Sequence, residues 1–162
     1  MVAEAYKRLD LRDTKTMALQ STIDTPNCDG INHADFSIDG RFAFFTCEFD
    51  GAIARIDLVN RTVLATILLT PFYDRPEVVA QLTTATDKKP VPVLRSQNLG
   101  ATVVATRGMP QDVRLSPDGR TLFVADMLAN GVHVVDVASF RQTGFIWTGP
   151  GAHGLDRKST RL

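Results

Sequence analysis

Short apolar stretches separated by turn-forming residues run through most of the chain, a pattern that is typical of β-strands joined by tight turns. The dipeptides Asp50-Gly51 and Asn130-Gly131 each separate two such stretches, which is a strong signal for a hairpin. The longest apolar stretch, 63–69, has the length of a strand, whereas a membrane-spanning helix needs about 20 apolar residues. The pattern therefore predicts an all-β fold without a transmembrane segment.

The chain contains an internal repeat. Residues 32–71 align without gaps on residues 111–150, at an offset of 79 positions. The identical residues are Ser37, Asp39, Gly40, Arg41, Phe44, Asp57, Ile67 and Pro71, which match Ser116, Asp118, Gly119, Arg120, Phe123, Asp136, Ile146 and Pro150. Because these identities fall in predicted turns and strands, we interpret the two segments as copies of one structural unit.

Each copy predicts four short strands. They lie at 33–37, 41–47, 52–58 and 62–69 in the first copy, and at 112–116, 120–126, 132–137 and 142–148 in the second. The turn between the first two strands contains Asp39-Gly40 or Asp118-Gly119, residue types that tight turns favour. Asp57 and Asp136 end the third strands, where we expect their carboxylates to accept backbone N–H bonds from the next turn.

The spacing of the copies favours a β-propeller over a β-sandwich. The second copy begins at Pro110 and a third begins near Ala152, an interval of 42 residues, which lies within the blade period of about 40–50 residues. We therefore predict an all-β fold: a propeller fragment of about two and a half to three four-stranded antiparallel blades, with an inserted loop or short helix.

An earlier, partial copy precedes these two. Leu9-Asp10 matches Ile56-Asp57, and Ser21-Thr22-Ile23 matches Ala65-Thr66-Ile67. Residues 5–25 are therefore expected to form the last two strands of a preceding blade.

The best-preserved motif resembles the repeat of YVTN-type propeller proteins. It consists of Ser116-Pro117-Asp118-Gly119-Arg120 with the apolar strand after it, followed by Gly131-Val132-His133-Val134-Val135-Asp136. The first copy is a looser match, with Ile38 at the position of Pro117. The same turn occurs in WD40 proteins and in cytochrome d1-type propellers, so the resemblance specifies the fold better than the function. It implies a larger, seven-bladed type of bacterial propeller protein in the periplasm or outside the cell.

We divide the chain into a partial propeller, residues 1–155, and a tail, residues 156–162. Within the propeller we expect the end of one blade at 5–25, a blade at 30–70, an insertion at 71–108, a blade at 109–150 and the start of the next blade at 151–155. Pro76 lies in the first turn of a short predicted helix inside the insertion. A degenerate blade is the alternative for this segment, because 79 residues is close to two blade periods.

The ends of the chain differ from the repeat. The polar tail 156–162 replaces an expected strand and turn, so we interpret it as non-native, with a genuine basic tail as the alternative. A propeller closes with about four to eight blades. Fewer blades leave strand edges open, and these edges are a predicted route to self-association.

Composition narrows the range of partners. Lys and Arg together number 18, as do Asp and Glu, so the sequence carries no basic footprint for nucleic acid.

Cys28 and Cys47 are too few to define a disulfide framework, and we expect two buried thiols. A disulfide between them is the alternative and would need an oxidising compartment.

Polar residues at the starts of the innermost strands are the candidate binding site. They are Asn32, His33, Gln111 and Asp112, with His153 at a similar position in the next copy. Imidazole and carboxylate groups suit first-row metals, so His33, Asp112 and His153 are the candidate ligands if a metal binds. The alternative is a set of wet channel residues that contact only water. His133 aligns with Ala54, and we expect it on the surface of a strand.

No residue is predicted to be catalytic. The chain has no phosphate-binding glycine loop and no haem-attachment motif, and the sequence requires no cofactor. We expect a module that binds a protein or a small molecule at one propeller face. The alternative is a metal- or cofactor-assisted enzyme, a lactonase-like hydrolase or an oxidoreductase, with its site at the mouth of the channel.

Overall fold

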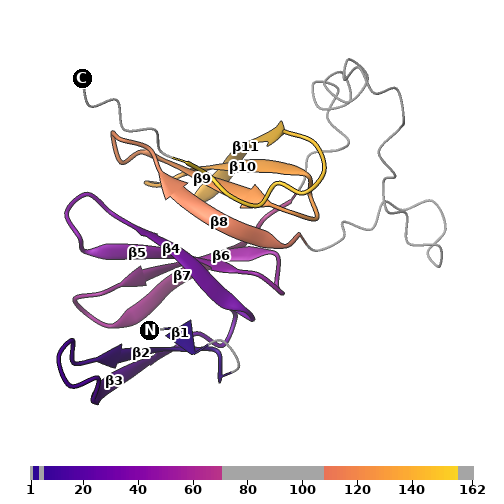
Figure 1. Ribbon diagram of the computed structural model, residues 1–162. Coiled ribbons are helices and arrows are strands. Elements are labelled where there is room, and N and C mark those ends of the chain that lie inside the picture. The colour runs from indigo at the N-terminus through magenta and orange to yellow at the C-terminus, as the bar shows by residue number, and fades with distance from the viewer. Residues whose placement is uncertain (1, 4–5, 71–107, 157–162) are drawn as a thin grey trace.

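A computed structural model describes residues 2–3, 6–70 and 108–156, and its strands form three antiparallel sheets (Figure 1). The first sheet has the order β1-β2-β3, the second β4-β5-β6-β7 and the third β11-β10-β9-β8. The strands of the first two sheets are β1 (Val2–Ala3), β2 (Arg8–Arg12), β3 (Leu19–Asp24), β4 (Ile31–Phe36), β5 (Phe42–Cys47), β6 (Ala52–Asp57) and β7 (Thr62–Leu68). Those of the third are β8 (Pro110–Leu115), β9 (Thr121–Asp126), β10 (Gly131–Asp136) and β11 (Arg141–Trp147).

The second and third sheets have the same pairing pattern. Phe42 pairs with Asp57 in the second sheet, and Thr121 pairs with Asp136 at the equivalent place in the third. Each sheet has a register shift near the start of its first strand and another in its last hairpin. The prediction of an all-β fold built from four-stranded antiparallel sheets is confirmed. The predicted helix lies outside the described residues, and within them no helix is long and apolar enough to cross a bilayer.

Strand β2 of the first sheet aligns with β6 of the second sheet, but in a different register from the one that we expected. Its closing turn begins at Asp13, whose Oδ1 accepts the backbone N–H groups of Lys15 and Thr16, just as Asp57 Oδ1 accepts those of Val59 and Asn60. The match between Asp10 and Asp57 is therefore wrong by three residues. The alignment was misled by the dipeptide Leu9-Asp10, which resembles Ile56-Asp57, whereas the true equivalent of Asp57 follows Arg12.

Backbone conformation supports the corrected register. Lys7 and Gly51 have positive φ values of 48° and 62°, and Asn130 in the third sheet has 60°. All three residues immediately precede the strand that leads to the closing Asp. Positive φ favours Gly and Asn, and this explains why the hairpin signal was clear at Gly51 and Asn130 but hidden at Lys7.

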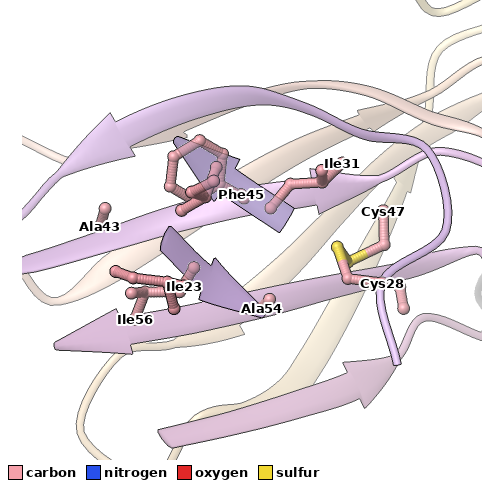
Figure 2. Close-up of a cluster of buried hydrophobic side chains, with 10 residues drawn as sticks. Ile23, Cys28, Ile31, Ala43, Phe45, Cys47, Ala54 and Ile56 are labelled. Carbon is pink, nitrogen blue, oxygen red and sulfur yellow. A yellow bond between two sulfur atoms is a disulfide. The ribbon is translucent and has the colours of Figure 1, made fainter. Parts of the chain in front are cut away.

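The second sheet has two buried faces, and this explains the near-continuous apolar sequence of β5. Ala43, Phe45 and Cys47 point toward the first sheet and pack against Leu9 and Ile23 (Figure 2). Phe44 points the other way and packs against the third sheet. A strand covered on one side only would alternate apolar and polar residues, whereas a strand between two sheets is apolar throughout.

A second core fills the space between the second and third sheets. Phe44, Ile53 and Leu69 from the second sheet meet a set of apolar residues from the third, namely Val113, Leu115, Leu122, Val124, Val135 and Phe140. Side-chain to backbone bonds also cross this joint: Arg55 Nη1 donates to the carbonyl of Val137 at 3.2 Å. The sheets are thus joined by side chains, while the strands within each sheet are joined by backbone ladders.

Cys28 and Cys47 form a disulfide with a Cα–Cα distance of 4.7 Å, and both side chains are buried (Figure 2). The expectation of two separate thiols is therefore wrong. Cys28 lies in the connection between β3 and β4, and Cys47 is the last residue of β5. The disulfide, which the sequence left open as the alternative, is therefore present; composition and spacing alone do not show that the connection before β4 lies beside the end of β5.

Acidic residues organise the turns at the opposite end of the strands. Asp39 Oδ1 accepts a bond from the Ser37 hydroxyl at 2.6 Å and one from the Arg41 N–H at 3.0 Å. Asp118 has the same partners one repeat later, namely Ser116 and Arg120. These bonds to the charged form, the serine hydroxyl first, lower the pKa values of both carboxyls.

We expect the protein to lose stability in acid because of these turn carboxylates. The pKa of Asp57 is lowered mainly by the backbone N–H of Asn60, so its contribution is full above the ordinary Asp pKa and is lost as the pH falls through the lowered value. Thermal unfolding followed by circular dichroism should give a lower Tm at pH 3 than at pH 7. Asp57→Asn should reduce this difference, and equal Tm values at the two pH values would contradict the prediction.

Candidate functional site

The first strands of the second and third sheets, β4 and β8, lie side by side (Figure 1). Asp35 Oδ2 accepts the backbone N–H of Leu115 at 2.7 Å and thereby joins the two strands. In this arrangement the beginning of each strand, with Asn32 and His33 in one and Gln111 and Asp112 in the other, reaches the same end of the joint.

Glu48 bridges the two sheets at this end. Its Oε2 accepts a bond from Asn32 Nδ2 at 3.1 Å, and its Oε1 accepts one from Gln111 Nε2 at 2.8 Å. We call Asn32, His33, Glu48, Gln111 and Asp112 the strand-start cluster. Glu48 was not predicted, because the equivalent position in the next copy is Met127 and the repeat comparison therefore gave no signal.

Asp112 is the most connected member of the strand-start cluster, and its side chain is buried. Its Oδ1 lies 2.8 Å from Arg114 Nη1 and 3.9 Å from His33 Nδ1. Its Oδ2 accepts the backbone N–H of Leu155 at 2.9 Å. The imidazole of His33 is about half exposed, with 46% of its side-chain area accessible. The cluster therefore combines a fixed, buried carboxylate with an accessible imidazole.

His153 is exposed and makes no hydrogen bond or ion pair with His33 or Asp112 in the described part of the chain. The structure thus links four of the five predicted site residues through Glu48 and Asp112, and His153 takes no part in these bonds. Residues 2–3, 6–70 and 108–156 contain no group of three or more His, Cys, Asp or Glu side chains that could hold a metal ion.

A second polar cluster, which the sequence did not indicate, has a fully buried centre in the third sheet. His133 Nε2 lies 3.2 Å from Asp126 Oδ2, and both side chains are 0% exposed. Gln142 Nε2 lies 3.0 Å from His133 Nδ1, and the ring of Phe145 meets the imidazole edge-on at 4.9 Å. The expectation of a surface histidine is wrong, because His133 faces the neighbouring sheet, as Ala54 does one repeat earlier.

This buried cluster holds backbone as well as side chains. Asp126 Oδ1 accepts the N–H groups of Met109 and Ala129, both at 2.8 Å. Gln142 exchanges two bonds of 2.8 Å with the backbone of Thr70, in the preceding sheet. Asp126 occupies the position of Cys47 in the repeat, so a carboxylate with its hydrogen bonds stands where the second sheet has the disulfide. Its contacts are those of a structural centre without access to ligands.

A shallow cleft of about 400 Å³ opens between the first and second sheets. It is lined by Lys7, Pro26, Asn27, Asp50, Thr66 and Leu68. The ammonium group of Lys7 forms an exposed ion pair with Asp29 at 3.2 Å. An exposed pair of this kind contributes little free energy, so the cleft is less well organised than the strand-start cluster.

Solved structures with similar backbones are β-propeller-type proteins. Hydrazine synthase of Kuenenia stuttgartiensis matches 91% of this chain with a TM-score of 0.61 and 14% sequence identity. Apo AztD of Citrobacter koseri matches 92% with a TM-score of 0.54 and 17% identity. The chain spans 32% of the length of each of these proteins.

No family model matches the sequence, and no curated protein matches it. At these levels of identity the structural likeness bears on the fold alone. The two complete four-stranded sheets, their shared register and the structural neighbours agree on one architecture. The chain has a β-propeller fold.

Proposed function

We propose that this chain is a binding module of a larger YVTN-type propeller and that it recognises a protein or small-molecule ligand at the strand-start cluster. The observation that carries the proposal is the bridge from Glu48 to Asn32 and Gln111, which fixes polar groups of two blades at one end of their joint. Binding sites need polar groups that are held in place before the ligand arrives.

The chemistry of the cluster favours a polar ligand. Both carboxylate oxygens of Glu48 accept bonds from amide groups, which leaves the amide oxygens of Asn32 and Gln111 as acceptors. His33 adds an accessible ring that can donate or accept. A ligand with hydroxyl, amide or ammonium groups would match this set, whereas an apolar ligand would leave the buried polar groups unpaired.

The proposal is tested by NMR with the full chain and a panel of sugars, amino acids and small amines as probes. We expect a binding probe to shift the resonances of His33, Gln111 and their neighbours. Gln111→Ala should weaken its binding about tenfold, which corresponds to the loss of one good hydrogen bond. Asp39→Ala, in a turn at the far end of the strands, is the matched control and should leave binding unchanged. Shifts confined to other surfaces would overturn the proposal.

A metal-assisted enzyme is the second candidate, favoured by the distance of 3.9 Å between His33 and Asp112. Imidazole and carboxylate ligands suit zinc and related ions, and further ligands would have to come from outside the described residues. Adding Zn²⁺ in the same NMR experiment separates the candidates. Saturable, stoichiometric shifts of the His33 ring resonances would support the metal-assisted enzyme. Their absence would favour the binding module.

We also propose that the protein works in the periplasm or outside the cell. The buried disulfide between Cys28 and Cys47 supports an oxidising compartment, because disulfides persist there and are rare in the cytosol. Alkylating the protein in intact cells, before and after reduction, provides the test. Two thiols that react without reduction would place the protein in a reducing compartment instead.

A further inference from the structure

Glu48 carries a charge that no cation balances within the described part of the chain. Its carboxylate is half-buried, and its partners there are the side-chain amides of Asn32 and Gln111, at 3.1 and 2.8 Å. These amides are neutral, so they satisfy the carboxylate oxygens as hydrogen-bond donors but do not balance their charge. Asp112 differs, because the guanidinium of Arg114 lies 2.8 Å from its carboxylate. The strand-start cluster therefore holds one carboxylate that is matched in charge and one that is not.

The remaining hydrogen-bonding capacity of the cluster suits a donor-rich cation. Each oxygen of Glu48 accepts one bond in the bridge and has room for a second. The amide oxygens of Asn32 and Gln111 accept no bond within the described residues, and neither is one of the buried atoms that lack a partner, so both are accessible. A primary ammonium group has three donors and no acceptor. Placed at the bridge, it would donate to Glu48 and to an amide oxygen.

An exposed aromatic ring lies beside this bridge. Phe49 follows Glu48 in the turn after β5 and is 52% exposed. A Cβ atom added at Gly30 would lie 2.8 Å from Cδ2 of Phe49 and 3.1 Å from Cβ of Glu48, so both side chains lie against the same glycine. The face of an aromatic ring attracts cations. The bridge and the ring together therefore offer an organic cation both a carboxylate and a π-surface.

Other classes of ligand match these groups less well. An anion would meet the unbalanced negative charge of Glu48 and would be repelled. A neutral hydroxyl or amide group would form hydrogen bonds at the bridge but would leave that charge uncompensated. Charge thus separates the ligand classes that hydrogen-bonding capacity alone would admit.

We propose that the strand-start cluster selects ligands that carry a primary ammonium group, as a small organic amine or a lysine side chain does. Glu48 supplies the charge and the main acceptor, the oxygens of Asn32 and Gln111 supply further acceptors, and Phe49 supplies the ring face. The inference rests on the proposed function and deepens it, because it names the class of ligand.

The test compares two probes of the same size, n-butylamine and 1-butanol, by NMR with the full chain at neutral pH. The amine is protonated there, as a lysine side chain is. The side-chain amide resonances of Asn32 and Gln111 report on the bridge directly. We expect n-butylamine to shift them saturably and 1-butanol to bind at least about tenfold more weakly, because it cannot form a charge-assisted hydrogen bond to Glu48.

Three variants locate the effect. Glu48→Gln keeps the size of the side chain but removes its charge, and it should weaken the binding of n-butylamine at least about tenfold. Asp39→Asn removes the same charge from a turn at the far end of the strands, so this matched control should bind as the parent chain does. Phe49→Leu should weaken binding about two- to fivefold, whereas Phe49→Tyr keeps the ring and should preserve it.

Two results would overturn this inference and leave the proposed function in place. One is equal binding of n-butylamine and 1-butanol at the cluster, and the other is an equal loss of amine binding in Glu48→Gln and Asp39→Asn. An absence of shifts at Asn32 and Gln111 with n-butylamine would also overturn it. In that case a sugar that shifts these resonances keeps the proposed function, whereas no response to any probe of the panel ends both proposals.

A short peptide with one lysine distinguishes the two sources of the ammonium group, and both results support the inference. Tighter binding of the peptide than of n-butylamine indicates a protein partner that presents a lysine side chain. Equal or weaker binding of the peptide indicates a small amine.

Discussion

Replacing Asp126 by alanine should lower the free energy of unfolding by about 3 kcal/mol, because it removes a fully buried acceptor from several donors at once. The backbone N–H groups of Met109 and Ala129 would lose their partner, as would Nε2 of His133. Ala129 and His133 are buried, so these two donors cannot reach water without a local opening of the structure. Urea unfolding of the full chain provides the measurement.

The control for this prediction is Asp118→Ala, in an exposed turn of the same sheet. It removes a carboxylate with a backbone bond but leaves no buried group unpaired, so a much smaller loss is expected. Asp126→Asn keeps one acceptor oxygen and should fall between the two. If Asp126→Ala and Asp118→Ala had the same effect, the buried cluster would not be the structural centre that its contacts indicate.

Removing the disulfide should cost about 3 kcal/mol, the value expected from loop closure for a sequence separation of 19 residues. The protein for this experiment is the double variant Cys28→Ala and Cys47→Ala, which leaves no unpaired thiol. Its Tm should lie several degrees below that of the parent chain. A second contribution comes from the packing that both sulfur atoms make in the core between the first two sheets.

A reducing agent offers an independent check on the contribution of the disulfide to the free energy of unfolding. It should lower the stability of the parent chain to about that of the double variant, and it should leave the double variant unchanged. If the reducing agent destabilised both proteins equally, its effect would not pass through the bond between Cys28 and Cys47.

The fold could be predicted from the sequence because the two copies share the residues that form their turns and strands. Turn residues such as Asp118 and Gly119 act locally, so their chemistry is visible in the order of residues. The register of β2 could not be predicted in the same way. At Lys7 a residue without a turn preference adopts the left-handed conformation that Gly51 adopts in the next sheet, and tertiary packing overrides the local signal.

The candidate site could be predicted only in part. The starts of β4 and β8 follow from the repeat, and they locate Asn32, Gln111 and Asp112. Glu48 and the buried pair of Asp126 and His133 do not follow from it, because each stands where the other copy has a residue of different chemistry. Repeats reveal what the copies share, whereas these contacts depend on what distinguishes the copies.

The two faces of each sheet also bear on how such an array can grow by gene duplication. The face of the second sheet toward its predecessor contains Ala54 and Ile56, and the face toward its successor contains Phe44 and Ile53. Because the two faces differ, a joint of this kind is heterologous and gives the array a direction. A blade copied in tandem keeps both of its faces in the orientation that its neighbours require. A blade turned the other way round would meet its neighbour with two faces of the same kind.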